Sequence, residues 1–403
     1  MKHKYSEDEV FQVSTKKQLE NRVIGEFKLQ YGNDPCNVTL TPGRINIIGE
    51  HTDYNSGLAM PAAIDRWICV AISQSNNKSS TIYSLNYKKC ITIFPKSTDK
   101  IQYSWIQLAT TAIHILTTEF GLKEGGNVVV GGNIPIGGGL SSSTAFVIAI
   151  TYTFCQLFSI QIRDRKLAYL CQKIEHIALG TACGLLDQYS IILSKKNNFM
   201  VIDFHDDTIE YIPIYLNEYS WIVVNSQIQR ELFDSAYIQR VNECKDGLEI
   251  LKEKFNIDGF RNIDIDMLLE LKSNHEILYK RLLHLVDEND RVKDMIDQLE
   301  QGATNKIGTI LKKSHESLRL LYQVSCKEID FIIERSDNFD GWHGGRMIGG
   351  GFGGCSIHLL SNHVVDDYHR YLTTNYKKKY NIDPDILKVT FSGGLQNINP
   401  IQL

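Results

Sequence analysis

Three segments of this sequence combine glycines and polar side chains in ways that suit chemistry on a bound ligand. The first is a run of small residues that opens an expected helix: Gly137, Gly138, Gly139, Leu140, Ser141, Ser142, Ser143 and Thr144. Glycines let backbone amides approach an anion, and a helix N-terminus adds unpaired N–H groups and roughly half a positive charge. A serine that only caps a helix needs no such run around it. The segment therefore predicts a phosphate-binding loop, although no Walker-type GxxxxGK[ST] pattern occurs.

The second segment, residues 341–354, is also rich in glycine and matches GxGxxG at Gly349, Gly351 and Gly354. A dinucleotide-binding fingerprint must follow a strand and open a helix. Here the next residues, 355–360, have the pattern of a strand, so the match does not support an NAD-dependent dehydrogenase. We expect a tight loop that packs against a ligand or against the first glycine loop, with a purely structural hairpin as the alternative.

The third segment, residues 43–55, sets hydrogen-bonding side chains among isoleucines. The polar members are Arg44, Asn46, Glu50, His51, Asp53 and Asn55. Carboxylates together with arginine and histidine suit a polyhydroxylated ligand, whose hydroxyls need both donors and acceptors. The alternative is a solvated loop, which the interspersed Ile45, Ile47 and Ile48 disfavour.

Two further carboxylates, Glu175 and Asp187, lie about twelve residues apart around the end of an expected helix. They could act together on a ligand. On sequence alone, Glu175 could equally lie on the exposed face of its helix.

The elements that must position these segments are of both kinds. Strands are expected over residues 38–40, 67–73, 80–84, 91–94, 127–130, 199–203, 209–214, 221–225, 355–360 and 387–391. Helices are expected over residues 103–120, 141–158, 163–179, 235–254, 264–288, 305–335 and 364–376. Because strands and helices are partly segregated along the chain, the pattern predicts an α+β fold and not a doubly wound sheet.

Length and charge narrow the function classes. The chain has 403 residues, and a boundary near residue 215 would divide it into domains 1–215 and 216–403. With 43 basic and 47 acidic side chains the net charge is −4, which argues against a nucleic-acid binder. Residues 125–162 carry no charge, but their glycines, Pro135 and polar residues favour a buried helix over a membrane span.

The cysteines and the start of the sequence indicate a compartment. Nine cysteines are widely spaced without a CxxC pair, which is typical of reduced thiols in a cytoplasmic protein. The first residues contain no apolar stretch of the kind found in a secretory signal. We therefore expect a cytoplasmic protein without a membrane or nucleic-acid partner.

Taken together, the three segments resemble the three signatures of the GHMP kinase superfamily, which includes galactokinase, homoserine kinase and mevalonate kinase. Residues 43–61, GRINIIGEHTDYNSGLAMP, are similar to the galactokinase family in particular, as are CGLLDQ at 183–188 and SAY at 235–237. The similarity extends from about residue 20 to the end. It implies a two-domain fold with ATP and sugar in the cleft, a monomer, and transfer of the ATP γ-phosphoryl group to the anomeric hydroxyl of galactose.

The resemblance also implies roles for individual residues. Asp187 matches the catalytic carboxylate and Arg44 the arginine that stabilises the transition state, while Ser143 and Glu175 match ligands of Mg²⁺. The sugar-binding positions are Glu50, His51, Thr52, Asp53, Gly184 and Tyr237. The nucleotide-binding positions are Gly137, Gly138, Gly139, Leu140, Ser141, Ser142 and Ser143, with Ser84 as a further contact.

The sequence also departs from the family pattern. Thr41 and Thr144 stand where the family has alanine, and we expect both to be tolerated. An Asn-Tyr pair after Trp105, a Gly-Gln pair before Glu175 and the usual residues at 391–395 are missing, which bears on purine and sugar selectivity. The alternatives are a related 1-kinase for N-acetylgalactosamine, arabinose or galacturonate, and a catalytically silent galactose and ATP sensor. Loss of a catalytic group would favour the sensor, and none is lost.

Overall fold

The computed structural model describes residues 15–94, 104–180, 184–228 and 233–398. Within them, eight strands form a large mixed sheet: β1 (Asn37–Ile48), β2 (Leu58–Gln74), β3 (Ser80–Ser84), β4 (Lys89–Ile93), β5 (Gly126–Gly132), β6 (Asn198–Asp203), β7 (Thr208–Pro213) and β12 (Gln396–Ile398). Four form a second, antiparallel sheet: β8 (Tyr219–Asn225), β9 (Trp342–Ile348), β10 (Cys355–Ser361) and β11 (Asp385–Val389). Residue 215, the expected domain boundary, lies between β7 and β8.

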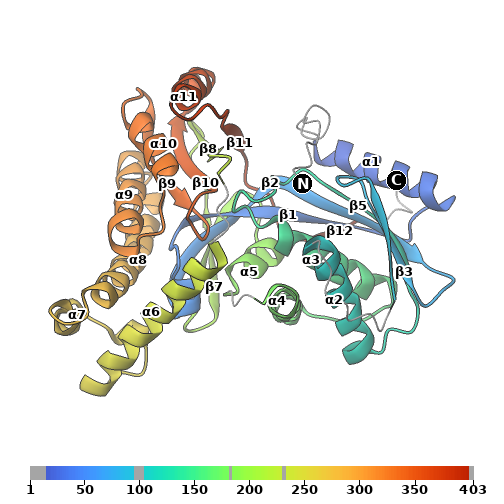
Figure 1. Cartoon of the computed structure of the whole chain (residues 1–403). Helices are drawn as coiled ribbons and strands as arrows, with labels where there is room; N and C mark the ends of the chain where they lie inside the picture. The colour runs from blue at the N-terminus through green and yellow to red at the C-terminus, as the bar shows by residue number, and fades with distance from the viewer. Residues whose placement is uncertain (1–14, 95–103, 181–183, 229–232, 399–403) are drawn as a thin grey trace.

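The large sheet is covered on both faces because its strands alternate apolar residues on either side. On one face Cys69, Ala71 and Val129 pack with α1 (Lys16–Tyr31). On the other, the intervening Val70 and Ile72 belong to the main core, which includes much of α3. Figure 1 shows α1 above the sheet and helices α2 to α5 below it. These are α2 (Ser104–Phe120), α3 (Ser142–Leu157), α4 (Asp164–Leu179) and α5 (Leu186–Leu193).

The second sheet has its own core with the helices of the second half. They are α6 (Phe233–Lys254), α7 (Ile265–Lys272), α8 (Glu276–Glu300), α9 (Thr304–Ser317), α10 (Lys327–Asp337) and α11 (Val365–Tyr380). The second glycine-rich segment spans β9 and the turn at residues 349–354, which joins β9 to β10 in a hairpin. The architecture confirms the α+β expectation.

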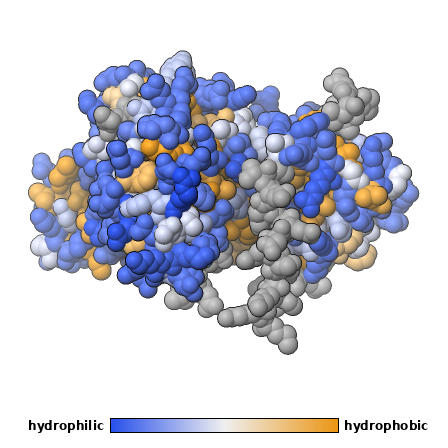
Figure 2. Space-filling view, turned by 90° about the horizontal axis from the view of Figure 1, so that it is seen from above, coloured by the Kyte–Doolittle hydropathy of each residue, from blue (hydrophilic) through white to orange (hydrophobic). Residues whose placement is uncertain are grey.

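The buried helix expected at 141–158 is confirmed as α3, which is apolar and largely enclosed. In the part of the chain that the structure describes, no helix combines the length and apolar content that crossing a bilayer requires. The face shown in Figure 2 is mainly hydrophilic, with hydrophobic residues in separate groups between polar ones.

Several expected boundaries were wrong. The strands expected at 38–40 and 67–73 are much longer. They run through Pro42 and Pro61, each of which lies beside a shift in the β1–β2 register, where a missing N–H is tolerated. The helix expected at 264–288 is divided between α7 and α8. The helix expected at 305–335 is interrupted after a π-turn by Gln323, whose left-handed φ of 57° ends it. Tyr103, the first residue of the helix expected at 103–120, lies outside the described residues.

Candidate active site

A cavity of about 320 Å³ opens where the two halves of the chain meet, in the size range of small-molecule sites. It brings together most of the residues that the sequence singled out: Arg44, Glu50, His51, Asp53, Gly137, Gly139, Leu140, Ser141, Ser142, Ser143, Glu175, Gly184, Asp187 and Tyr237. Asn46, Tyr54, Thr144, Gly349 and Gly350 also contribute to its wall. The expected clustering of the three segments is therefore found in the fold.

Arg44, on strand β1, bonds both to Asp187 and to the glycine loop. Its Nε lies 2.6 Å from Oδ1 of Asp187, in the first turn of α5, and its Nη1 donates to the carbonyl of Gly139 at 2.5 Å. Its backbone N–H bonds to the carbonyl of Leu140 at 3.2 Å. One arginine thus fixes the carboxylate of Asp187 and the glycine loop relative to each other.

The glycine loop ends in a strained residue. Ser141 precedes α3 with a left-handed φ of 58°, and its side chain makes no capping bond to the helix. Its hydroxyl donates instead to Oδ2 of Asp187. The interpretation of this serine as a simple N-cap is therefore wrong, since the left-handed turn aims its side chain at the carboxylate.

The second glycine-rich segment packs on the first. A Cβ on Gly138 would lie 3.0 Å from the sulfur of Cys355, and one on Gly349 would lie 3.4 Å from Cα of Gly139. Gly349 and Gly350 also line the cavity. The turn packs against the first glycine loop, as the main expectation stated; because it also lines the cavity, it is more than the purely structural hairpin of the alternative.

Glu175 of α4 is only 4% exposed, so the alternative that places it on the exposed face of its helix is wrong. Its two oxygens accept hydrogen bonds from Thr144 at 2.9 Å and Gln188 at 2.7 Å. Burial, and then the negative charge of Asp187, raise the pKa of Glu175 to about 7. A carboxylate in this situation is stabilised by a nearby cation. Mg²⁺ prefers oxygen ligands and takes one or two carboxylates besides phosphate, so Glu175 and Ser143, which line the same cavity, fit such an ion.

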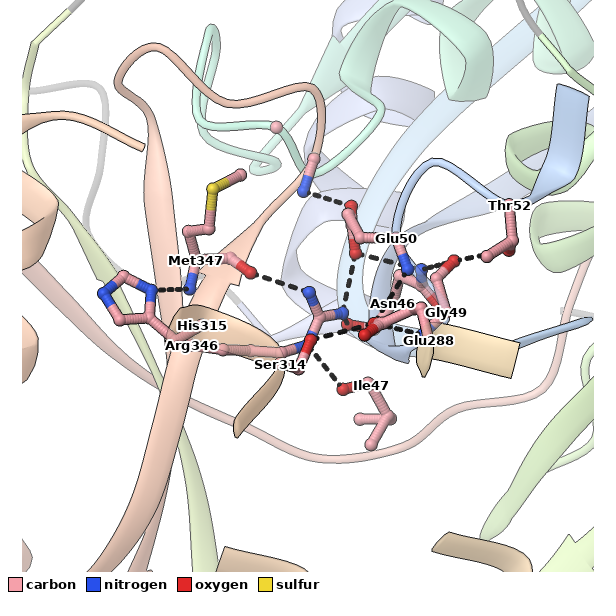
Figure 3. Close-up of polar contacts among 12 residues, drawn as sticks. Asn46, Ile47, Gly49, Glu50, Thr52, Glu288, Ser314, His315, Arg346 and Met347 are labelled. Carbon is pink, nitrogen blue, oxygen red and sulfur yellow. Dashed lines mark hydrogen bonds and ion pairs between the residues drawn. The ribbon is translucent and has the colours of Figure 1, made fainter. Parts of the chain in front are cut away.

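Glu50 is held by the second half of the chain (Figure 3). Its Oε2 accepts from Arg346 at 2.6 Å and from Nδ2 of Asn46 at 3.0 Å, while its Oε1 accepts from the N–H of Gly349 at 2.6 Å. Burial raises the pKa of Glu50, and the charge of Arg346 opposes that rise. Arg346 is fully buried and also donates to the carbonyls of Asn46 and Ile47.

A second buried carboxylate, that of Glu288 on α8, holds the backbone of the turn that contains Glu50. It accepts the N–H groups of Gly49 at 3.0 Å and Glu50 at 3.2 Å, and it pairs with Arg291 at 2.6 Å. Burial acts to raise the pKa of Glu288, but Arg291 and further cations outweigh it and lower the pKa to about 2. Sequence reasoning missed Arg346 and Glu288. The available signal was a charged residue within an otherwise buried strand or helix face.

The remaining sugar-binding candidates surround this segment. His51 has a left-handed φ of 64°, and its Nδ1 lies 2.8 Å from the hydroxyl of Tyr54. Burial lowers the pKa of His51 to about 3, so the ring is neutral. Burial and the charges of Asp187 and Glu50 raise the pKa of Asp53 to about 7.

Gly184 and Thr52 act on the shape of this region. A Cβ on Gly184 would lie 1.9 Å from Oδ2 of Asp53, so only glycine leaves room for that carboxylate. Thr52 does not line the cavity. Its hydroxyl bonds to the carbonyls of Gly49 and Leu58 at 2.9 and 2.7 Å, which fixes the turn after β1.

Ser84 lies in a second, mainly apolar hollow that adjoins the first. Its wall includes Ile68, Tyr87, Trp105, Ile136 and Phe146, and it shares Ser142 and Ser143 with the cavity described above. The rings of Tyr87 and Trp105 stack with centroids 5.5 Å apart. A flat aromatic base suits such a wall, with its phosphates at the start of α3.

Comparison with known proteins agrees with this arrangement. The "Galactokinase galactose-binding signature" matches residues 25–74, and the "GHMP kinases N terminal domain" matches residues 107–195. A galactokinase of Thermosipho africanus is 34% identical over 357 residues, which cover 89% of this chain and 98% of that relative. The chain belongs to the galactokinase family.

The solved structures extend this assignment to the fold. The crystal structure of Lactococcus lactis galactokinase complexed with galactose matches with a TM-score of 0.85 and 27% identity, covering 93% of this chain and 99% of that one. A mevalonate kinase matches with a TM-score of 0.60 at 17% identity, over 88% of this chain and 99% of that one, which shows the shared GHMP fold. The galactokinase family fold expected from the sequence is thus confirmed.

Proposed function

We propose that this cavity carries out the galactokinase reaction, transfer of the ATP γ-phosphoryl group to the anomeric hydroxyl of galactose, with Asp187 and Arg44 as the catalytic residues. The observation that carries this assignment is the Arg44–Asp187 pair, at 2.6 Å, set between the glycine loop and the carboxylate-rich segment after β1. An acceptor hydroxyl beside Asp187 can therefore face a phosphoryl group held by the loop.

Asp187 orients the attacking hydroxyl and accepts its proton. Phosphoryl transfer passes through a loose transition state, which requires little deprotonation before the transfer begins. Acceptance of the proton can therefore come late, and such help contributes roughly 10²–10⁴ in rate. The hydrogen bond from Ser141 and the pair with Arg44 hold both oxygens of the carboxylate in place.

Arg44 supplies positive charge at the point of phosphoryl transfer. Its guanidinium bridges Asp187 and the carbonyl of Gly139, so a positive group lies where the glycine loop meets the acceptor. A fixed cation at this point stabilises the negative charge that spreads over the phosphoryl oxygens. Backbone N–H groups at the start of α3 bind the remaining phosphates.

Ser143 and Glu175 would hold Mg²⁺, which when bound supplies positive charge that offsets the charge of the phosphates. Glu50, His51, Asp53, Gly184 and Tyr237 would form the galactose site, with Thr52 shaping its backbone. Ser84 would lie near the base of ATP.

The domain division 1–215 and 216–403, a cytoplasmic location and a monomeric state belong to the same proposal. All eight cysteines among the described residues are free thiols, which supports a reducing compartment. Light scattering after size-exclusion chromatography measures the oligomeric state.

The test is ATP consumption, measured in a coupled assay with galactose, N-acetylgalactosamine, arabinose and galacturonate. We expect the highest kcat/KM with galactose. Among the described residues that line the cavity, Arg44 is the one arginine and no lysine occurs, and Arg44 is engaged by Asp187, so nothing there offers a cation to the carboxylate of galacturonate. Consumption with another sugar alone would favour the related 1-kinase, and binding of galactose and ATP without consumption would favour the sensor.

A further inference from the structure

We propose that Asn46 is a further galactose-binding residue, whose side-chain oxygen accepts a hydrogen bond from a sugar hydroxyl remote from the anomeric carbon. The proposal rests on the galactokinase reaction in this cavity; Asn46 is a polar member of the third segment, but none of the residue roles above is assigned to it. It starts from buried polar atoms that have no partner, because leaving such an atom unpaired costs free energy.

Ten buried side-chain nitrogen or oxygen atoms lack a hydrogen-bond partner within the described residues. Two of them belong to residues that line the cavity, Nε2 of His51 and Oδ1 of Asn46. His51 is a sugar-binding position in the family resemblance. The same structural criterion that finds His51 independently therefore also finds Asn46.

The orientation of the Asn46 amide is fixed by its neighbours (Figure 3). Its Nδ2 donates to the carbonyl of Gly49 and to Oε2 of Glu50, both at 3.0 Å. Both partners are acceptors, so a flipped amide would place oxygen against oxygen. The unpaired atom is therefore the carbonyl oxygen, and it can only accept.

The donors that surround Asn46 are engaged by other acceptors. Arg346 holds both the backbone carbonyl of Asn46, at 2.6 Å, and the carboxylate of Glu50, at 2.6 Å. Gly349 occupies the other oxygen of Glu50. Because Asn46 also lines the cavity, a hydroxyl of the bound sugar is a donor that can pair with this oxygen, and a site built in this way discriminates against a sugar that lacks the matching hydroxyl.

The position of Asn46 on β1 indicates which part of the sugar it reaches. Arg44 and Asn46 pair in regular register with Ala63 and Pro61, so their side chains point to the same side of the strand. Two residues span roughly 7 Å along a strand. With Arg44 on Asp187, where the anomeric hydroxyl is bound, Asn46 lies about one ring width further on. We therefore expect its partner to be the 3-, 4- or 6-hydroxyl.

The test combines one variant with sugars that lack single hydroxyls. We measure kcat/KM of the wild type and Asn46→Ala with galactose and with 2-, 3-, 4- and 6-deoxygalactose. With galactose the substitution should lower kcat/KM roughly tenfold. With one of the 3-, 4- or 6-deoxy sugars it should lower kcat/KM no further, because the bond is already absent.

Ser314→Ala is the matched control. Ser314 donates to Glu288 at 2.8 Å in the same buried network and does not line the cavity, so its loss should affect all the sugars by one factor. The same uniform factor for Asn46→Ala would overturn the proposal, because a purely structural role through Glu50 gives that result. Failure of the wild type to phosphorylate galactose would instead overturn the proposed function.

A second measurement is made on the wild type, so it does not depend on the activity of a variant. In protein with ¹³C-labelled asparagine, the side-chain carbonyl resonance of Asn46, assigned through Asn46→Asp, should shift on addition of galactose. It should not shift with the deoxy sugar that escapes the substitution. An unchanged resonance at saturating galactose would also overturn the proposal.

Discussion

The two ends of the cavity balance their charges in opposite ways. At the sugar end (Asn46, Glu50, Glu288 and Arg346), each carboxylate faces an arginine, and backbone or side-chain donors occupy every carboxylate oxygen. At the transfer end (Arg44, Glu175, Asp187 and the glycine loop), Arg44 pairs with Asp187, whereas Glu175 accepts its hydrogen bonds from the uncharged Thr144 and Gln188.

The pKa values express the same contrast. The pKa of Glu288 is lowered to about 2, because Arg291 and other cations outweigh its burial. The pKa of Glu175 is raised to about 7, because burial and the charge of Asp187 act together. The carboxylates of the sugar end are thus each matched by an arginine, whereas the transfer end carries surplus negative charge that suits a divalent cation.

The two ends are built by different parts of the chain. The sugar end is rigid because elements of the second half, α8 and β9, clamp the segment that follows β1. The transfer end is built almost wholly from the first half, around β1, α3, α4 and α5. Substitutions at the sugar end should therefore affect stability and galactose affinity, and those at the transfer end should affect turnover and metal use.

The largest effect on stability is expected from Glu288→Gln. Because the pKa of Glu288 lies near 2 in the folded protein and near 4.5 when unfolded, the ionised form stabilises the fold by about 3 kcal/mol at pH 7. That contribution is complete above pH 4.5 and is lost as the pH falls through about 2. Urea denaturation at pH 7 and pH 3 should show a difference between wild type and variant that shrinks in acid.

The control for Glu288 is on the same helix. Glu276 pairs with Lys280 at the exposed start of α8, and Glu276→Gln should leave the free energy of unfolding unchanged. An equal loss of stability in both variants, or a difference independent of pH, would contradict the stabilising role of ionised Glu288.

A smaller effect is expected from Gly184→Ala, which should disturb galactose binding more than turnover. The added Cβ must displace the carboxylate of Asp53, so KM for galactose should rise roughly tenfold or more with less change in kcat. Gly25→Ala in α1 is the control, since nothing lies within 4 Å of a Cβ there. An unchanged KM would show that Asp53 does not contact the sugar.

The smallest effect is expected from Thr144→Ala at the transfer end. Thr144 and Thr41, the two departures that the sequence analysis expected to be tolerated, each make a hydrogen bond: Thr144 to Glu175, and Thr41 to the carbonyl of Ala145 at 2.8 Å. Loss of a bond worth about 1 kcal/mol should raise the Mg²⁺ concentration for half-maximal activity roughly fivefold while galactose affinity stays constant. Thr144→Ser should behave as wild type. A change in galactose affinity would contradict the separation of the two ends.

The sequence predicted the parts of the site that are contiguous in the chain. The glycine loop, which opens the expected helix at 141–158, and the polar segment that follows the expected strand at 38–40 meet in the cavity. Asp187 joins them from α5, a helix that the sequence analysis did not predict. The burial of Glu175 and the clamp from Arg346 and Glu288 could not be predicted. The clamp depends on contacts between residues more than two hundred positions apart, and Glu175 is buried by Thr144 and Gln188 from two other helices; a charged residue in an apolar pattern marks such a position but does not name its partner.

The fold shows the same limit. The apolar α3 and the hairpin around the second glycine segment follow from local composition. The full length of β1 and β2 does not, because only pairing with register shifts makes Pro42 and Pro61 compatible with strands. Strand β12, at the end of the described chain, pairs with β1 at its beginning, and a three-residue strand has no signal of its own.

The most direct test of the account is Asp187→Asn, measured for turnover and for galactose binding on the same preparation. We predict that kcat falls roughly 10²–10⁴-fold while the calorimetric Kd for galactose stays within a few-fold of wild type, since the sugar end keeps all its own bonds. Turnover within a few-fold of wild type would contradict the catalytic role of Asp187. Loss of galactose binding together with turnover would contradict the division of the cavity into two ends.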